Sequence, residues 1–361
     1  MSNNQRPLIF DGHNDLLSHL VAFRGKDLTA LFMDGYERGH LDLPRMIQGG
    51  FGGGLFVLWV PSPIHRGNDK SNDKPQDMLD EEYDMPLEAE VFLADALPKV
   101  IQQLALLARI ERQSNGQLKI CTSADQVRAC LDSGVIAAVL HMEGAEAIDD
   151  DLNNLEVLYR AGLRSIGPVW SRPNRFGCGV PFRFPSSPDT GVGLTDLGKE
   201  LVQACNQMGM IVDVSHITEK GFWEIARISD APLVATHSNV HAISQQARNL
   251  TDKQLAAIKE SEGIVGVNFV TAFLRSDGQM RADTPLESIL QHIDYLIDKV
   301  GIDCIGFGSD FDGALIPEKI GDVTGLVSLR EAMRKHGYDE STMLKLYQGN
   351  WIRILDKTLK N

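Results

Sequence analysis

The sequence has few cysteines, no long apolar run and no cluster of basic residues. Its five cysteines are odd in number, scattered along 361 residues and without Cys-x-x-Cys spacing, which is typical of reduced thiols and not of a disulfide framework. No stretch reaches the roughly 18 apolar residues that a membrane span requires, and the N-terminus lacks the regions of a secretion signal. These absences predict a cytoplasmic protein that does not enter a membrane.

The charge of the chain also excludes some partners. There are 35 Lys and Arg against 49 Asp and Glu, a formal net charge of −14. Without a basic patch, this balance disfavours binding to nucleic acid or to an anionic membrane surface through bulk charge. Hydrophobic residues make up 43% of the chain, which is typical of a folded globular protein and excludes a mostly disordered one.

Eight short apolar runs alternate along the chain with amphipathic stretches. This alternation is typical of repeated strand-and-helix units, and several runs are apolar on both faces, as in strands of a parallel sheet that helices cover on both sides. The predicted strands are Leu8–Asp11, Gly54–Val60, Val135–His141, Arg164–Val169, Met210–Val214, Leu233–Thr236, Ile264–Phe269 and Cys304–Gly308.

Eight such units favour one α/β domain over residues 1–361, a (β/α)8 TIM barrel, with a doubly wound open sheet as the alternative. Leu326–Leu359 is expected to add C-terminal helices outside the barrel. Pro98 is expected to kink or break the helix that follows the second strand, and His65–Asp84 predicts a mobile loop over one mouth of the barrel. The predicted helices include Glu88–Arg112, Ala124–Leu131, Leu152–Ala161, Thr195–Met208, Lys220–Ile228, Asp252–Glu260 and Pro285–Val300.

Polar residues that can bind a metal follow five of the eight predicted strands. Because the catalytic groups of a barrel gather at the carboxyl ends of its strands, we expect these side chains to lie close together. In strand order they are His13 and Asp15, then Glu143, His216, His237 and Asp310.

Each of these residues has an ordinary explanation when it is taken alone. A His-x-Asp pair also occurs in turns, His216 and His237 fit core histidines, and Asp310 fits a helix cap. Glu143 is harder to explain in this way, because a carboxylate at the end of a buried strand needs a charge partner. All of these explanations would have to hold at once, and we therefore predict a single site.

The predicted set contains nitrogen and oxygen donors and no thiolate. Such donors suit zinc, or a related divalent ion, in a hydrolytic site. Five ligands exceed what one catalytic zinc normally takes, which favours two ions that share a carboxylate.

The ordered motifs resemble the membrane dipeptidase (renal dipeptidase) family of zinc peptidases, which have amidohydrolase-type barrels. The resemblance covers nearly the whole chain and implies an enzyme that hydrolyses free dipeptides and tolerates a D-residue at the C-terminal position. The matching segments are Asp11–Asp15, Glu143–Gly144, Asp213–His216, Thr236–Ser238, Arg248–Asn249, Gly308–Gly313 and Gly349–Asn350.

The resemblance also implies a ligand set for two zinc ions per chain. His13 and Asp15 would hold one ion, and His216 and His237 would hold the other. Glu143 would bridge the two ions, and a water shared by them would ionise near neutral pH.

Two further residues receive roles from the resemblance. Asp310 would handle the proton beside the shared water, and Arg248 would bind the α-carboxylate of the substrate. If the resemblance is left aside, Arg248 is best interpreted as a charged side chain that is exposed to solvent on a helix. Likeness to the family also suggests a homodimer, for which the sequence has no signal of its own, and a soluble bacterial type of enzyme.

The chain departs from the family at one place. Family members carry a histidine after the fourth strand that contacts the substrate carbonyl, and Trp170 occupies that position here. An indole donates one hydrogen bond and cannot accept a proton, so the oxyanion must be stabilised by zinc, by Arg172 or Arg175, or by water. Two alternatives stay open: another amidohydrolase-type hydrolase such as a lactonase, phosphotriesterase or deaminase, and a barrel that binds metal without turnover.

Overall fold

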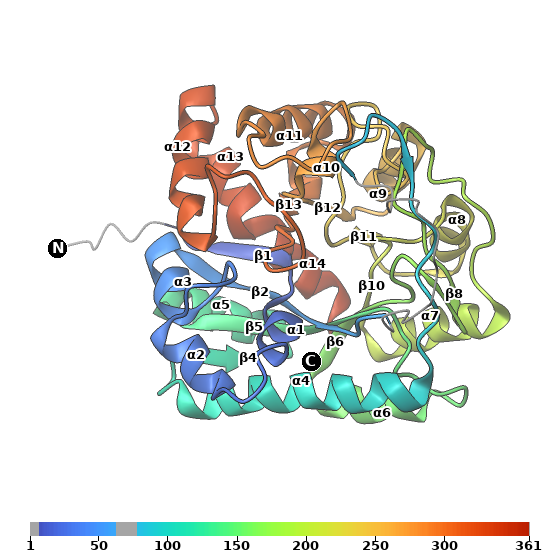
Figure 1. Ribbon diagram of the computed structural model, residues 1–361, viewed down its shortest axis with the longest axis horizontal. Coiled ribbons are helices and arrows are strands. Elements are labelled where there is room, and N and C mark those ends of the chain that lie inside the picture. Colours follow the sequence, from blue (N-terminus) through green and yellow to red (C-terminus); the bar gives the residue numbers. More distant parts are fainter. Residues whose placement is uncertain (1–6, 63–77, 361) are drawn as a thin grey trace, which may run out of the picture.

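Eight parallel strands lie at the centre of the molecule, and helices surround them (Figure 1). The computed structural model describes residues 7–62 and 78–360. All eight predicted strands are present, with ends that shift by a few residues. They are β1 (Ile9–Asn14), β2 (Phe51–Trp59), β5 (Ile136–Glu143), β6 (Leu163–Gly167), β10 (Ile211–Val212), β11 (Val234–Ala235), β12 (Ile264–Val267) and β13 (Ile305–Phe307).

The order of the strands identifies a barrel. Around the sheet the order is β10-β6-β5-β2-β1-β13-β12-β11, so strands that follow one another in the chain are neighbours. A parallel bridge between Asp213 and Val234 joins the two outer strands, and the Val214 amide donates to the Val234 carbonyl at 2.8 Å. The sheet is therefore a nearly closed eight-stranded barrel, which confirms the TIM-like fold over the open sheet. A ninth strand, β4 (Leu118–Ile120), pairs with β5 outside this ring.

The predicted helices are also present, and several begin at capping threonines. Thr195, Thr218 and Thr251 each accept a hydrogen bond from a backbone amide in the first turn of the following helix. The helices after β2 are α4 (Leu93–Gln113), α5 (Ala124–Ser133), α6 (Asn153–Arg160), α7 (Asp196–Met208), α8 (Glu219–Ile228), α9 (Asp252–Glu260), α10 (Thr271–Leu274), α11 (Glu287–Val300), α12 (Leu326–His336), α13 (Glu340–Leu344) and α14 (Asn350–Thr358).

Three short helices between β1 and β2 have no counterpart among the predicted ones: α1 (Leu16–Val21), α2 (Leu28–Asp34) and α3 (Leu43–Gly49). Of the kink or break expected at Pro98, the break is wrong, because α4 runs through this residue. Pro98 is the sixth residue of α4, and its missing N–H removes a single backbone bond.

The C-terminal helices pack on the barrel as expected. The Trp351 indole of α14 is buried and donates to the Phe307 carbonyl of β13 at 2.9 Å. A Cβ at Gly12 would lie 2.2 Å from the Trp351 ring, so glycine is required there for this contact.

Part of the predicted loop His65–Asp84 lies outside the described residues. Its described end, Met78–Asp84, contains the short strand β3 (Tyr83–Asp84), which pairs with β9 (Arg183–Phe184). Among the described residues, no helix is both long and apolar enough to cross a bilayer. A cytoplasmic location stays a prediction.

Candidate metal centre

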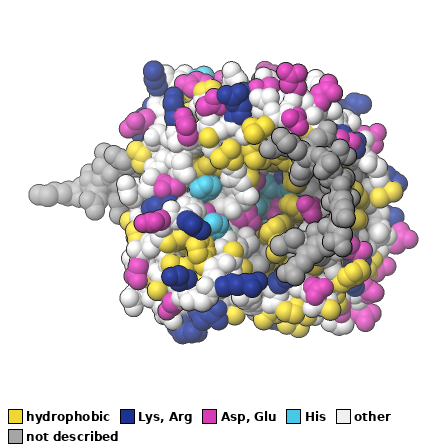
Figure 2. All heavy atoms as spheres, viewed as in Figure 1, with side chains coloured by type: hydrophobic (Ala, Val, Ile, Leu, Met, Phe, Trp, Pro, Cys, Tyr) yellow, Lys and Arg dark blue, Asp and Glu magenta, His cyan; other side chains and the backbone are white. Residues whose placement is uncertain are grey.

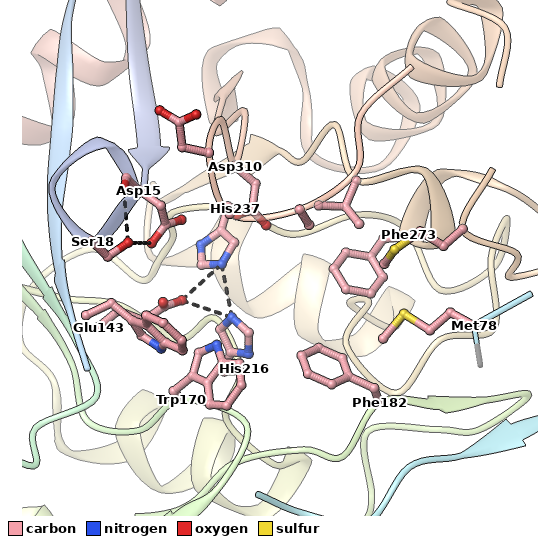
Figure 3. A pocket seen from close by; sticks show the side chains of 16 residues that line it. Asp15, Ser18, Met78, Glu143, Trp170, Phe182, His216, His237, Phe273 and Asp310 are labelled. Atoms are coloured by element: carbon pink, nitrogen blue, oxygen red, sulfur yellow. Dashed lines mark hydrogen bonds and ion pairs between the residues drawn. The ribbon is translucent and has the colours of Figure 1, made fainter. Parts of the chain in front are cut away.

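The five predicted ligands converge at the carboxyl ends of their strands. Glu143 lies at the centre of the group: its Oε1 is 3.0 Å from His216 Nε2, 3.3 Å from His237 Nε2 and 3.7 Å from His13 Nε2. Asp15 completes the group through Oδ2, which is 3.4 Å from His13 Nε2. Figure 3 shows Glu143, His216 and His237 pointing toward one another across the pocket.

The donor atoms of this group are shielded from water, and two of them lack a hydrogen-bond partner within the described part of the chain. Each of the five residues is at most 6% exposed. Among the described residues, no group hydrogen-bonds to His13 Nε2 or Glu143 Oε1. Buried polar atoms without partners cost free energy, and a cation between them would remove that cost.

The electrostatics of the site also favour a cation. Burial and the nearby carboxylates of Asp15 and Asp310 raise the pKa of Glu143 well above its usual value. Burial lowers the pKa of His13 to about 4, and it lowers the pKa values of His216 and His237 well below the usual range. The histidines are therefore neutral near pH 7 and carry the lone pairs that a metal needs. Two overlapping groups of donors, each within 4.8 Å, fit an ion: His13, Glu143 and His237, and His13, Asp15 and Asp310.

Hydrogen bonds fix which nitrogen of His237 faces Glu143. The Thr236 hydroxyl donates to Asp213 Oδ2 at 2.6 Å and therefore accepts from His237 Nδ1, which lies 2.8 Å away. Asp213 is itself held by backbone amides, since its Oδ1 accepts from Ser215 at 2.9 Å and from Thr236 at 2.8 Å. The proton thus lies on Nδ1 of His237, and Nε2 presents a lone pair toward the site.

The other ligands are positioned in a similar way. Nδ1 of His216 lies 2.8 Å from Ser171 Oγ, and the His216 backbone has a φ of +63° in the turn after β10. At the end of β1, the Asp11 carboxylate accepts from both the backbone amide and the hydroxyl of Ser309, each at 2.7 Å. These bonds tie the β1 segment that carries His13 to the end of β13.

Asp310 lies beside the group and lines the pocket. Its Oδ2 accepts a hydrogen bond from Asn268 Nδ2 at 2.9 Å. Burial raises the pKa of Asp310, while His13 partly opposes this shift. A carboxyl group with a raised pKa can take up and release a proton nearer neutral pH than an exposed aspartate can.

Arg248 is buried beside the pocket. Its guanidinium donates to Ser238 Oγ and to the His237 carbonyl, both at 2.9 Å, and its Cζ is 6.0 Å from the centre of the Phe273 ring. Its Nε has no partner among the described residues, and burial lowers its pKa to about 10. An unpaired N–H of a buried guanidinium is suited to a carboxylate.

Trp170 lines the pocket next to His216, with 5.9 Å between the ring centres. The Arg172 Cζ lies 5.1 Å from the centre of the Trp170 ring, but neither Arg172 nor Arg175 lines the pocket. The buried Arg172 guanidinium donates to Glu146 at 2.7 Å, to the Val60 carbonyl at 2.8 Å and to Ser62 at 2.9 Å, while Arg175 pairs with Asp150. These contacts leave both guanidinium groups engaged away from the reaction centre.

Two further histidines lie near the candidate ligands or follow one of them in the sequence. His141 is fully buried, with Nδ1 2.8 Å from Ser165 Oγ and Nε2 3.6 Å from Asp213, so it lies behind the ligands. His241 is 2.8 Å from the Ser186 carbonyl and is not among the pocket residues. Sequence analysis missed Asn268, Ser171 and the role of Thr236, because single polar residues next to a motif give no periodic signal.

The site lies at the base of a pocket of about 350 Å³. On the face shown in Figure 2, histidine and acidic side chains gather in a hollow that hydrophobic side chains border. The pocket is lined by the candidate ligands Asp15, Glu143, His216 and His237, by Asp310, and by several apolar side chains.

Comparisons with known proteins agree with this geometry. The sequence matches the family described as Membrane dipeptidase (Peptidase family M19) over residues 4–361. A metallo peptidase from Rhodobacter sphaeroides, liganded with a phosphinate mimic of L-Ala-D-Ala, is 50% identical, with a TM-score of 0.93 over 97% of this chain and 99% of that chain.

Two further relatives carry dipeptidase names. The dipeptidase AC, a metallo peptidase with a crystal structure, is 48% identical to this chain in sequence. Its TM-score is 0.91 over 98% of this chain and 99% of that chain. Dipeptidase tcpJ of Claviceps purpurea (strain 20.1) is 26% identical over 349 residues, which are 96% of this chain and 76% of the relative.

Proposed function

The chain is a metallo-dipeptidase of the membrane dipeptidase family, and we propose that it hydrolyses free dipeptides with two zinc ions held by the buried ligand group. The observation that carries this proposal is the convergence of five nitrogen and oxygen donors, from the ends of four strands, on one buried point. The donor set lacks sulfur and suits zinc in a hydrolytic site.

In this proposal His13 and Asp15 hold one ion, His216 and His237 hold the other, and Glu143 bridges them. The contact of His13 with Asp15, and the contacts of His216 and His237 with the central Glu143, support this division. When bound, two zinc ions supply a hydroxide at neutral pH and polarise the scissile carbonyl.

The residues of the chain perform the remaining steps. Asp310 takes the proton of the attacking water and passes it to the nitrogen of the leaving amine, a transfer that its raised pKa favours. Asn268 holds one oxygen of Asp310 in place for this exchange. Arg248 binds the α-carboxylate through its unpaired Nε–H, and Trp170 bounds the substrate beside His216.

The substrate follows from the same features and from the relatives. Because the Rhodobacter sphaeroides protein was liganded with an L-Ala-D-Ala mimic, we propose that this chain also accepts dipeptides with a D-residue at the C-terminal position. The homodimer stays a prediction, which light scattering of the purified protein would check.

Metal analysis of a bridging-residue variant tests the proposal. We expect close to two zinc ions per wild-type chain and at most one after Glu143→Ala, since both ions lose a ligand. The exposed Glu156→Ala on α6 is the matched control and should keep the wild-type zinc content. An unchanged zinc content in Glu143→Ala would refute the bridging role, and bound zinc without turnover of any dipeptide would support a catalytically silent barrel.

A further inference from the structure

The pocket has two unlike sides. In Figure 3 the carboxylates of Asp15 and Glu143 lie on one side of the two histidines, and Phe182, Phe273 and Met78 lie on the other. We call the second side the apolar wall. It consists of the pocket residues Met78, Phe182, Val270, Phe273, Met280 and Ala314.

The apolar wall is a small hydrophobic cluster separate from the barrel core. The rings of Phe182 and Phe273 stack with 6.2 Å between their centres and 13° between their planes. The Met280 amide donates to the Met78 carbonyl at 2.8 Å. These contacts connect segments that follow different strands, so the apolar wall is present without a bound substrate.

The position of Arg248 decides which substrate residue meets this wall. Its Cζ lies 6.0 Å from the Phe273 ring centre. The α-carboxylate and the side chain of a C-terminal residue branch from the same Cα atom. A dipeptide whose carboxylate is bound by Arg248 therefore carries its C-terminal side chain next to Phe273. The N-terminal residue lies nearer the carboxylate side, where its carbonyl must reach the ligand group.

The chemistry of the wall defines what it accepts. Its six side chains contain no hydrogen-bonding group and no charge, so an apolar side chain gains free energy there by leaving water. A polar side chain of the same shape would lose hydrogen bonds to water that the wall does not replace.

Resting on the dipeptidase function proposed above, we propose that the apolar wall selects dipeptides whose C-terminal residue has a large apolar side chain. The test is a series of L-Ala-D-Xaa dipeptides that differ only at the C-terminal side chain. We expect kcat/KM for D-Leu to exceed the values for D-Ala and for D-Asn, which has nearly the shape of leucine, each by at least about tenfold.

Variants test whether the apolar wall causes the preference for a C-terminal leucine. Phe182→Ala removes one face of the wall at a partly exposed position and should lower the Leu-to-Ala ratio of kcat/KM at least about fivefold, whereas Phe182→Leu should restore most of it. Phe92→Ala is the control, because Phe92 is 63% exposed and does not line the pocket. It should leave the ratio unchanged.

The outcomes separate this inference from the proposed function. Turnover with equal kcat/KM across the series would overturn the selection by the wall and leave the dipeptidase function intact. A preference for leucine that appears only at the N-terminal position, in L-Leu-D-Ala against L-Ala-D-Ala, would overturn the assignment to the C-terminal residue. Absence of turnover for every dipeptide would overturn the proposed function and this inference with it.

Discussion

Replacing Thr236 by valine should weaken metal binding although Thr236 is not a ligand. Threonine and valine have nearly the same shape, so Thr236→Val removes the hydroxyl and leaves no cavity. The hydroxyl donates to Asp213 at 2.6 Å and lies 2.8 Å from His237 Nδ1. Without it, the proton of His237 has no acceptor on Nδ1 and is free to move to Nε2, the atom that faces Glu143.

The size of the effect follows from these two bonds. Removing the partner that orients a metal-binding histidine typically lowers metal affinity by about 10- to 100-fold, or about 1.4 to 2.7 kcal/mol. Asp213 keeps its bonds from the amides of Ser215 and Thr236, so the turn itself should persist. The buried groups left without a partner should lower the free energy of unfolding of the metal-free protein by about 1 to 3 kcal/mol.

Competition with a chromophoric zinc chelator measures the affinity of each site, and thermal unfolding of the metal-free protein measures the stability. We expect one of two zinc sites to weaken in Thr236→Val, while Thr236→Ser, which keeps the hydroxyl, binds zinc within about threefold of wild type. Equal zinc affinity in wild type and Thr236→Val would refute the reasoning. Equal weakening in Thr236→Ser and Thr236→Val would show that loss of the hydroxyl does not explain the effect.

Three further predictions test other parts of the site and the fold. Asp310→Asn should keep both metal ions, because the amide is close to the same size, but should lower kcat by at least about 100-fold, as stopped assays of dipeptide hydrolysis would show; a kcat near wild type would exclude the proton transfer. Arg248→Ala should raise KM for a free dipeptide and leave the slow hydrolysis of a C-terminally amidated dipeptide unchanged, and an unaltered KM would contradict the carboxylate contact. His292 lies outside the site, where its Nδ1 accepts from the Val240 amide at 3.1 Å, its Nε2 is 3.0 Å from the Leu274 carbonyl, and burial lowers its pKa to about 4. Because the unfolded chain binds a proton at this histidine below about pH 6.5 and the folded chain does not until about pH 4, the free energy of unfolding should fall between these pH values. Denaturant titrations should therefore show the stability advantage of wild type over His292→Gln shrinking by about 2 kcal/mol from pH 7 to pH 5, and a constant difference would contradict the shift.

The barrel could be predicted because buried parallel strands have a strong sequence signal. Runs such as 136–140 are apolar at every position, and eight of them alternate with amphipathic helices. The three helices between β1 and β2 escaped prediction because each spans only six or seven residues, too few for helical periodicity to stand out. The break expected at Pro98 is also wrong. The sequence predicts a helix from Glu88, whereas α4 begins at Leu93, so Pro98 lies closer to the start of the helix than expected.

The candidate ligands could be predicted because each lies at the end of a strand or within a few residues after it. A residue at a strand end has its place fixed by the barrel, so His13, Glu143, His216 and His237 could be brought together before any coordinates existed. The groups that orient them could not be found in this way. Ser171 belongs to the segment after β6 yet contacts His216 after β10, and Asn268 follows β12 yet bonds Asp310 after β13. Such contacts depend on loop geometry, which has no period.

In this pocket, the residues proposed to carry out the chemistry and those proposed to select the substrate come from different parts of the fold. The ligand side is built from strand ends, whose spacing the closed sheet fixes, so changing one position there disturbs the whole ligand group. The apolar wall is built from loops and the short helix α10, and Phe182 and Phe273 meet only through packing between segments that follow different strands. Loop segments accept substitutions with little cost to the barrel. Substitutions at Phe182 and Met280 should therefore alter which dipeptide is preferred while the metal centre stays as it is.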